Sequence, residues 1–466
     1  MRSGLELRIE GALALLLAAC AGCGDGAGGG SADADSDTDT DADSDTDVDS
    51  YTDVDSDTDA DPDPSCEPLG PPDGNLIAVG PDQVGELQGI VAAAETGDVI
   101  LLEDGTYPLD GAYLWFGTPG VTLRSESGDP EAVVIDGNYA TTEIVTVAAS
   151  DVTIAEVTLQ RAYTHPIHVT SSELGDTVGT LIYRVRLIDP REQAIKINPH
   201  SDSGVYPDGG EIACSLMLLT DEGRPNVNPT SGGCYTGGVD AHQARDWIIR
   251  DNRIEGFWCG NGLSEHAIHL WNGCRDPIVE RNVLVNNARG VGFGLVTSGD
   301  ARTYDDDPCP EAGAAYVDHY GGVVRNNFVF ADRAELFSSG AGYDCGICLW
   351  SACAARVFHN TLVSTEDHIS SIEWRFAASQ GIEIANNLAT DSLWEREEAS
   401  AELAGNLEGA ATDLVADLGA GDLHLAADAA AAIDQGVSLE PGLCDDDIDG
   451  DPRDGAPDIG ADEVIP

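Results

Sequence analysis

Seven short apolar segments of this 466-residue chain carry polar side chains at matching positions, and these side chains are the best candidates for chemistry. The segments are 166–169, 194–197, 238–241, 267–270, 290–293, 346–349 and 371–374. Because side chains alternate along a β-strand, the Ile or Val at the second position and the residue at the third point to opposite faces. The third positions hold His168, Lys196, Asp240, His269, Gly292, Cys348 and Glu373. Two residues later, on the same outer face, come Thr170, Asn198, His242, Trp271, Gly294, Trp350 and Arg375.

Lys196 is the only lysine of the chain, and every other Lys or Arg position is arginine. An arginine does not lose its proton in a protein, whereas a desolvated lysine can, and the lysine ammonium is the more compact charge. Codon preference with one lysine left over would give the same count. The place of Lys196 in the aligned columns favours a functional amine or point charge.

The columns suit proton abstraction next to a carboxylate. Stacked strands lie about 4.8 Å apart, so Lys196, Asp240 and His269 fall on three successive layers. Removing the proton beside the carboxylate of a uronic acid needs a group that neutralises the carboxylate, a base and an acid. We predict that Lys196, or a bound cation, neutralises the carboxylate and that His242 or His269 is the base. Asp240 is predicted to orient a histidine.

The remaining outward side chains are predicted to bind substrate. Trp271 and Trp350 offer flat faces for sugar rings. The other predicted substrate-binding residues are His168, Asn198, Glu373 and Arg375. A solvated face with one Lys–Asp pair is the structural alternative, but such a face should be rich in Thr, Ser, Glu and Arg rather than in His and Trp.

Hydrolysis of a glycosidic bond is less favoured by the pattern. That reaction needs two carboxyl groups across the bond. Asp240, Glu265 and Glu373 are the candidates, and no close acidic pair is predicted on the face. His266 precedes its strand, and we predict that it points inward or into a turn, outside the site.

A second repeated series predicts the fold that positions these columns. Segments 247–252, 278–282, 323–327, 356–360 and 383–387 each end in Asn and are followed by another apolar pair. Asn tolerates left-handed backbone and can form hydrogen-bonded ladders between stacked turns. Strands recurring at variable spacing predict an all-β, right-handed parallel β-helix, with a propeller or sandwich as the alternatives. Residues 84–95, the one amphipathic stretch, predict a short N-terminal capping helix.

Both ends of the repeated region support this fold by resemblance. Segment 90–107 resembles the capping helix and first strand of the pectate-lyase-like β-helix superfamily. Segments 421–425, 432–436, 449–453 and 458–463 resemble the closing segment of secreted bacterial β-helix proteins. These motifs imply fold and export rather than a particular reaction.

A local pattern resembles mannuronan epimerases and related uronan lyases. The segment 238–242, Gly-Val-Asp-Ala-His, with Lys196 one layer earlier, is similar to their Asp-Pro-His motif and preceding lysine. The resemblance implies that Lys196, Asp240 and His242 are catalytic. The family has Tyr three residues before the Asp, where this chain has Gly237, and Tyr235 is predicted to point elsewhere.

The N-terminal residues 1–66 are predicted to be an export signal followed by a spacer. Residues 1–19 form a lipoprotein signal peptide, and Leu17 to Cys20 resemble a bacterial lipobox, which implies lipid on Cys20. Residues 20–66, rich in Gly and then in Asp, Ser and Thr, are predicted to be a disordered acidic linker. The β-helix is assigned to 67–440 and a closing segment to 441–466. The expected location is the bacterial outer membrane or cell surface, held by lipid alone.

The net charge and the number of cysteines limit the classes of partner and the cellular compartment that we expect for this protein. The net charge of −62 argues against nucleic acid and against binding to anionic lipid by charge. Ten cysteines beyond Cys20 and Cys23 predict disulfides in an exported protein. Cys345, Cys348 and Cys353 are alternatively a metal site, although no histidine lies near them in sequence.

The sequence therefore predicts a surface-anchored, carbohydrate-active β-helix protein whose partner is an acidic polysaccharide. Two functions remain open. One is a lyase or epimerase of uronic-acid polysaccharide, and the other is a non-catalytic carbohydrate-binding or adhesive protein. No cofactor is certain, and Ca²⁺ is a candidate.

Overall fold

The computed structural model describes residues 66–173, 175–200, 204–313 and 315–465, all within one compact unit that spans 62–466. The predicted signal peptide 1–19, the lipidated Cys20 and nearly all of the linker lie outside the described residues. Among the described residues, no helix has the length and apolar character needed to cross a bilayer.

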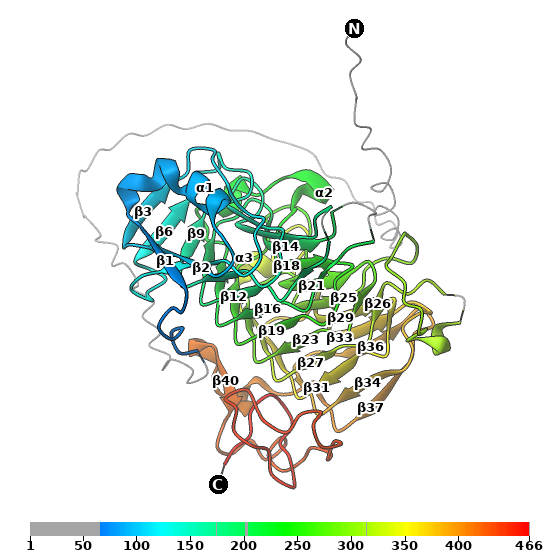
Figure 1. Cartoon of the computed structure of the whole chain (residues 1–466). Coiled ribbons are helices and arrows are strands. Elements are labelled where there is room, and N and C mark those ends of the chain that lie inside the picture. The colour runs from blue at the N-terminus through cyan, green and yellow to red at the C-terminus, as the bar shows by residue number, and fades with distance from the viewer. Residues whose placement is uncertain (1–65, 174, 201–203, 314, 466) are drawn as a thin grey trace, which may run out of the picture. The chain divides into compact units, whose positions relative to one another are not determined.

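Three long parallel sheets, named A, B and C here, build the molecule, and their strands follow one another in repeated coils (Figure 1). In coil order sheet A contains β1 (Asn75–Val79), β2 (Asp98–Leu102), β5 (Thr122–Ser125), β8 (Thr153–Ala155), β12 (Leu181–Tyr183), β16 (Glu211–Ala213), β19 (Ile248–Arg250), β23 (Ile278–Glu280), β27 (Val323–Arg325), β31 (Arg356–Phe358), β34 (Ile382–Ala385) and β37 (Ala401–Ala404). The chain is thus a right-handed parallel β-helix, as predicted.

Sheets B and C complete each coil. Sheet B contains β3 (Gly105–Pro108), β6 (Val133–Asp136), β9 (Thr158–Gln160), β13 (Arg186–Ile188), β17 (Leu216–Leu218), β20 (Arg253–Glu255), β24 (Val283–Val285), β28 (Phe328–Ala331), β32 (Thr361–Ser364), β35 (Leu388–Ala389) and β38 (Leu407–Glu408). Sheet C contains β4 (Leu114–Phe116), β7 (Val145–Val147), β10 (Ile167–Thr170), β14 (Gln193–Asn198), β18 (Gly237–His242), β21 (Ile268–Trp271), β25 (Val291–Phe293), β29 (Cys345–Trp350), β33 (Ser370–Arg375) and β36 (Leu393–Arg396).

Smaller elements lie in the connections and at the ends. The short parallel sheets are β11 (Thr177–Val178) with β15 (Pro207–Asp208), and β22 (Cys274–Arg275) with β26 (His319–Tyr320) and β30 (Ala352–Cys353). The α-helices are α1 (Val84–Ala93), α2 (Thr230–Gly233) and α3 (Ala334–Phe337). An antiparallel pair, β39 (Val415–Asp417) and β40 (Asp422–Leu425), follows the last coil. Helix α1 confirms the predicted capping helix, because it buries Leu87 and Val91 on the core.

The core is a stack of aliphatic side chains between the three sheets. In sheet C, Ile195, Val239, Ile268 and Val291 occupy the same place on successive coils and are fully buried. Burying one such side chain contributes about 1.5–3 kcal/mol. A single coil cannot bury this face alone, so the coils must stack.

An asparagine ladder fixes the turn between sheets A and B. The side-chain oxygen of Asn327 accepts from both the backbone and the side-chain nitrogen of Asn282, each at 2.9 Å, and its own Nδ2 donates to Asn360. The ladder continues through Asn252, Asn282, Asn327, Asn360, Asn387 and Asn406. The predicted ladder is confirmed, but the left-handed residue is the one before each ladder asparagine, for example Asp251 at φ 55°.

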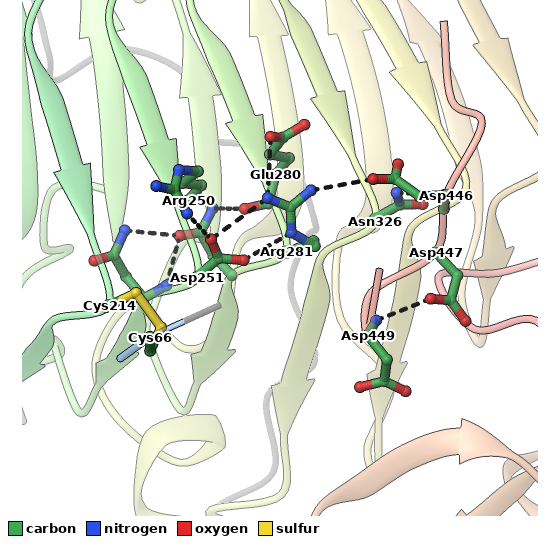
Figure 2. A network of polar contacts seen from close by, with 12 residues as sticks. Cys66, Cys214, Arg250, Asp251, Glu280, Arg281, Asn326, Asp446, Asp447 and Asp449 are labelled. Carbon is green, nitrogen blue, oxygen red and sulfur yellow. Dashed lines mark hydrogen bonds and ion pairs between the residues drawn. A yellow bond between two sulfur atoms is a disulfide. The ribbon is translucent and has the colours of Figure 1, made fainter. Parts of the chain in front are cut away.

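The outer side of this turn carries ion pairs that reach the C-terminal segment (Figure 2). Asp251 pairs with Arg281 at 2.7 Å, and Arg281 in turn approaches Asp446 at 3.6 Å. The carbonyl of Asp446 also accepts from Asn326 at 2.9 Å. The last residues of the chain therefore pack against the coils rather than extending away from them.

Disulfides confirm the prediction for eight of the ten body cysteines. The pairs are Cys66–Cys214, Cys234–Cys259, Cys309–Cys353 and Cys345–Cys348. Cys274 and Cys444 are buried free thiols. An even count therefore overstated the pairing, because two thiols fit as small buried side chains.

Candidate functional site

The predicted register of sheet C is confirmed strand by strand. His168 pairs with Lys196, Lys196 with Asp240, and Asp240 with His269. The same column continues through Gly292 and Cys348 to Glu373. In the second column His242 lies beside Trp271, and Trp350 beside Arg375. The polar residues predicted to share the outer face therefore do share it.

Lys196, Asp240 and His242 form one contact cluster on that face. The Lys196 ammonium donates to Asp240 Oδ2 and, at 2.9 Å, to His242 Nε2. His242 Nε2 is also 3.2 Å from Asp240 Oδ2. Two of the three ammonium N–H groups are thus taken, and the third has no partner among the described residues. One donor remains for a ligand.

The charges in this cluster are fixed by its contacts. Burial acts to raise the pKa of Asp240, but the charge of Lys196 holds it well below its usual value. Burial acts to lower the pKa of Lys196, but Asp240 and then Tyr235 raise it. Burial and the ammonium of Lys196 both lower the pKa of His242. At neutral pH the cluster therefore holds an ammonium, a carboxylate and a neutral imidazole.

Trp271 and His269 extend the cluster to the next coil. Trp271 Nε1 donates to Asp240 Oδ1 at 2.9 Å, and its ring meets His242 edge-on at 4.5 Å. His269 Nδ1 lies 3.7 Å from Asp240 Oδ1 and 3.3 Å from Glu265 Oε2. Asp240 and Glu265 thus flank one nitrogen, and the prediction of no close acidic pair is wrong.

That acidic pair is nevertheless poorly suited to hydrolysis. The reaction needs one carboxyl group that stays protonated, with a raised pKa. Contacts with His269 lower the pKa of Glu265 against the effect of burial, and the pKa of Asp240 is lowered too. Neither group is placed to act as the general acid.

Tyr235 lies on the insert before β18, within electrostatic range of the cluster. Its phenol is close enough to Lys196 and Asp240 for their charges to act on its pKa, which burial raises. An insert brings it there: the backbone N–H of Tyr235 donates to Asn228, whose side chain donates to Glu192 at 2.6 Å. The Cys234–Cys259 disulfide holds the same insert.

His168, one coil before Lys196, and Asn198, on the same strand as Lys196, form a neighbouring group. His168 Nε2 lies 2.8 Å from Asn198 Oδ1, and its Nδ1 lies 2.9 Å from Glu143. Both residues are part-exposed. They continue the polar face from Lys196 toward the start of the coil.

Trp350, Glu373 and Arg375 lie apart from the Lys196 cluster, on later coils. Trp350 donates to Glu373, which is fully buried and pairs with Arg396 at 2.9 Å. Arg375 pairs with Glu397 at 2.7 Å. The face therefore holds two polar groups, with Gly292 and Gly294 on the coil between them.

Pointing away from the core does not leave these side chains open to solvent. Lys196 is 9% exposed, Asp240 is 3% exposed and His269 is fully buried. A surface hollow of about 390 Å³ lined by Arg245, Arg275 and Tyr304 contains none of the predicted site residues.

His266 was missed by the sequence interpretation, and a glycine was the signal for it. The ring of His266 lies on the outer face beside His269, with 4.3 Å between ring centroids. A Cβ on Gly292 would come within 2.6 Å of that ring. A glycine in a column of large side chains thus marks a place that another residue fills.

The outer column ends in exposed tryptophans on both sides. Trp115 on β4 pairs with Thr146, the neighbour of His168, and Trp394 on β36 pairs with Glu373. Their exposed fractions are 45% and 43%. They give the face flat apolar surfaces at each end.

Comparison with known proteins identifies the fold. Pectate lyase Pel9A superposes with a TM-score of 0.50 at 14% identity, covering 84% of this chain and 96% of that one. The catalytic unit of a thermostable GH87 α-1,3-glucanase from Streptomyces thermodiastaticus gives 0.45 at 13%, covering 73% and 65%. A mannuronic acid specific polysaccharide family 6 lyase from human gut microbiota gives 0.37 at 12%, covering 69% and 66%.

Of these three, the pectate lyase reaches a TM-score of 0.50, and at 14% identity this likeness bears on architecture alone. The likeness to pectate lyase Pel9A supports the predicted β-helix fold. No family model and no curated protein sequence matches the chain.

Proposed function

We propose that the outer face of sheet C binds an acidic polysaccharide and that the Lys196 cluster removes the C-5 proton of a uronic-acid unit, as a lyase or an epimerase. The supporting observation is the Lys196 ammonium, which Asp240 and His242 hold while one N–H stays available. A carboxylate bound there would place its α-carbon beside the neutral His242.

Each side chain has a role in this proposal. Lys196 stabilises the negative charge that develops on the uronate carboxylate. His242 Nε2 takes the C-5 proton, after the substrate has displaced its hydrogen bond from Lys196. Tyr235, whose pKa burial raises, keeps its proton at neutral pH and gives it to the leaving oxygen or back to C-5. Asp240 positions Lys196 and Trp271.

The polymer is proposed to run along the face past Trp115 and Trp394. Aromatic faces suit the apolar side of sugar rings. The face belongs to a protein that we propose is exported and held at the bacterial surface by lipid on Cys20. The chain as a whole is strongly negative and repels an acidic polymer. We therefore propose that the polymer is recognised at the cluster, where Lys196 supplies a positive charge.

The test is a panel of polymannuronate, polyguluronate and polygalacturonate incubated with the purified chain, with and without Ca²⁺. A lyase produces the ultraviolet absorbance of a new double bond, and an epimerase exchanges the C-5 proton in deuterated water. His242→Gln should lower the rate about 10²–10⁴-fold, the usual contribution of a general base. His424→Gln, at the far C-terminal end, is the matched control and should keep the parent rate.

The second candidate is a non-catalytic carbohydrate-binding protein, favoured by the deep cover over Lys196 and by the exposed tryptophans. It predicts binding without either signal. Trp115→Ala and Trp394→Ala would then each weaken binding about tenfold, or about 1.4 kcal/mol. Binding that needs Lys196 but yields no product would decide for this candidate.

A further inference from the structure

His266 is a fully buried histidine whose ring nitrogens are both without a hydrogen-bond partner among the described residues. A buried polar group left unpaired costs about 1–3 kcal/mol, so such groups call for an explanation. The ring does not fill a core position, because it lies on the outer face over Gly292. The two unpaired nitrogens therefore indicate a ligand-binding position.

Glu265 and His269 complete a set of ligands around it. One ligand atom from each of Glu265, His266 and His269 lies within 4.8 Å of the others. His269 Nε2 is 3.3 Å from the carbonyl of Gly294, and a carbonyl only accepts, so Nε2 carries a proton. Such a bond is what fixes a metal-binding imidazole with its other nitrogen free. Nδ1 then faces Glu265 Oε2 at 3.3 Å, and a nitrogen and a carboxylate oxygen so close share either a proton or a metal cation.

We propose that Glu265, His266 and His269 bind a divalent transition-metal ion of the zinc class. Two imidazoles and one carboxylate form a ligand set that suits Zn²⁺, whereas Ca²⁺ takes oxygen ligands. The side chain of Glu265 is 24% exposed, so the site opens to solvent on that side. The open coordination position is free to take an anionic oxygen of a ligand. Metal binding here does not depend on whether the Lys196 cluster is catalytic.

The Cys345–Cys348 pair is the competing ligand set. Both sulfur atoms also lie within 4.8 Å of a His266 nitrogen. The fold therefore brings a histidine beside these cysteines, although none lies near them in sequence. In the disulfide they have no thiolate to offer. In the oxidised protein, Glu265 and His269 are therefore the partners left for His266, and the separate group His424, Asp449 and Asp462 lies at the C-terminal end.

The test is Zn²⁺ titration of the full, metal-stripped chain by calorimetry, without reductant and in excess Ca²⁺ to fill weak carboxylate sites. We expect one Zn²⁺ per chain. His266→Phe should weaken it at least about 100-fold, because even outer-shell changes cost up to that much. Glu265→Gln, on a part-exposed residue that keeps its shape, tests the same site should His266→Phe fail to fold.

His319→Phe is the matched control, since His319 is also buried with unpartnered nitrogens but lies outside the set. It should bind Zn²⁺ as the parent does. The proposal is overturned if no Zn²⁺ binds, or if Glu265→Gln binds it unchanged. It is also overturned if binding appears only after reduction and is lost in the Cys345→Ser/Cys348→Ser variant.

Discussion

The asparagine ladder and the outer face of sheet C are both rows of polar side chains on successive coils, yet they are organised differently. The ladder repeats one residue type, and each member satisfies its neighbour. The face changes residue type at every coil, and it leaves donors and acceptors of Lys196 and His266 without partners. Repetition with full satisfaction indicates structure, whereas variation with unmet polar groups indicates a place for a ligand.

Breaking the charge pair on the face should have the largest effect on stability. Lys196→Met leaves the Asp240 carboxylate buried without its partner, which we expect to lower the free energy of unfolding by about 3–5 kcal/mol. Urea denaturation at pH 7 measures it. The double variant Lys196→Met/Asp240→Asn removes both charges and should recover most of the loss. A single variant within about 1 kcal/mol of the parent would contradict the pairing.

Disrupting the asparagine ladder should lower the free energy of unfolding by less than Lys196→Met does, because the ladder groups are neutral. Asn327→Ala removes the oxygen that accepts twice from Asn282 and the donor to Asn360. We expect a loss of about 2–4 kcal/mol for the unpaired buried groups, measured in the same way. Asn226→Ala is the control, since Asn226 is exposed and its side chain makes only a long bond of 3.4 Å to Glu222 and a bond with Tyr139 among the described residues. An equal decrease in the free energy of unfolding of both variants would show that a ladder asparagine stabilises the fold no more than an exposed one.

Protonation distinguishes the amide ladder from the buried imidazoles near sheet C, because amides do not titrate; the example is His319 on β26, in the connection that follows sheet C. Burial lowers the pKa of His319, which stacks on Phe293, from 6.5 to about 3. The unfolded chain binds this proton first, so the stability from a neutral His319 is complete above pH 6.5 and is lost as the pH falls toward 3. His319→Phe should reduce the slope of stability against pH between 6 and 5 by about 1.4 kcal/mol per unit. An unchanged slope would contradict the buried neutral state.

The smallest effect is expected at the C-terminal end, outside both rows. Asp449 raises the pKa of His424 to about 9, above its unfolded value, with a further contact to Asp422 at 2.5 Å. This contribution is complete below pH 6.5 and is lost as the pH rises through 9. Since the pairs are part-exposed, His424→Gln should cost under about 1 kcal/mol at pH 6 and nothing at pH 10. Thermal melts at the two pH values test the sign.

The repeated strands made the coil and the register of sheet C predictable from sequence. An inward Ile or Val at every second place leaves one possible alignment, so Lys196, Asp240 and His269 had to be neighbours. The Asn series likewise located the turn, although the left-handed residue was assigned one position too late. These features depend on local alternation and on stacking, which the sequence carries directly.

Residues on inserts could not be placed in the same way. Tyr235 and Glu265 reach the site through segments without repeats, whose paths depend on the Cys234–Cys259 disulfide and on bonds to Glu192. The cover over Lys196 escaped prediction for the same reason, since alternation says which way a side chain points but not what lies above it. His266 was left out because it precedes its strand and was predicted to point inward or into a turn.

The disulfide between Cys66 and Cys214 has a mechanical consequence (Figure 2). A pull on the chain ahead of Cys66 enters the coil through Cys214, in the turn after β16, the sixth strand of sheet A. The first five coils therefore carry no load, and they cannot peel off one after another under tension. Force arrives instead at the coil that holds Asp240, in the middle of the stack.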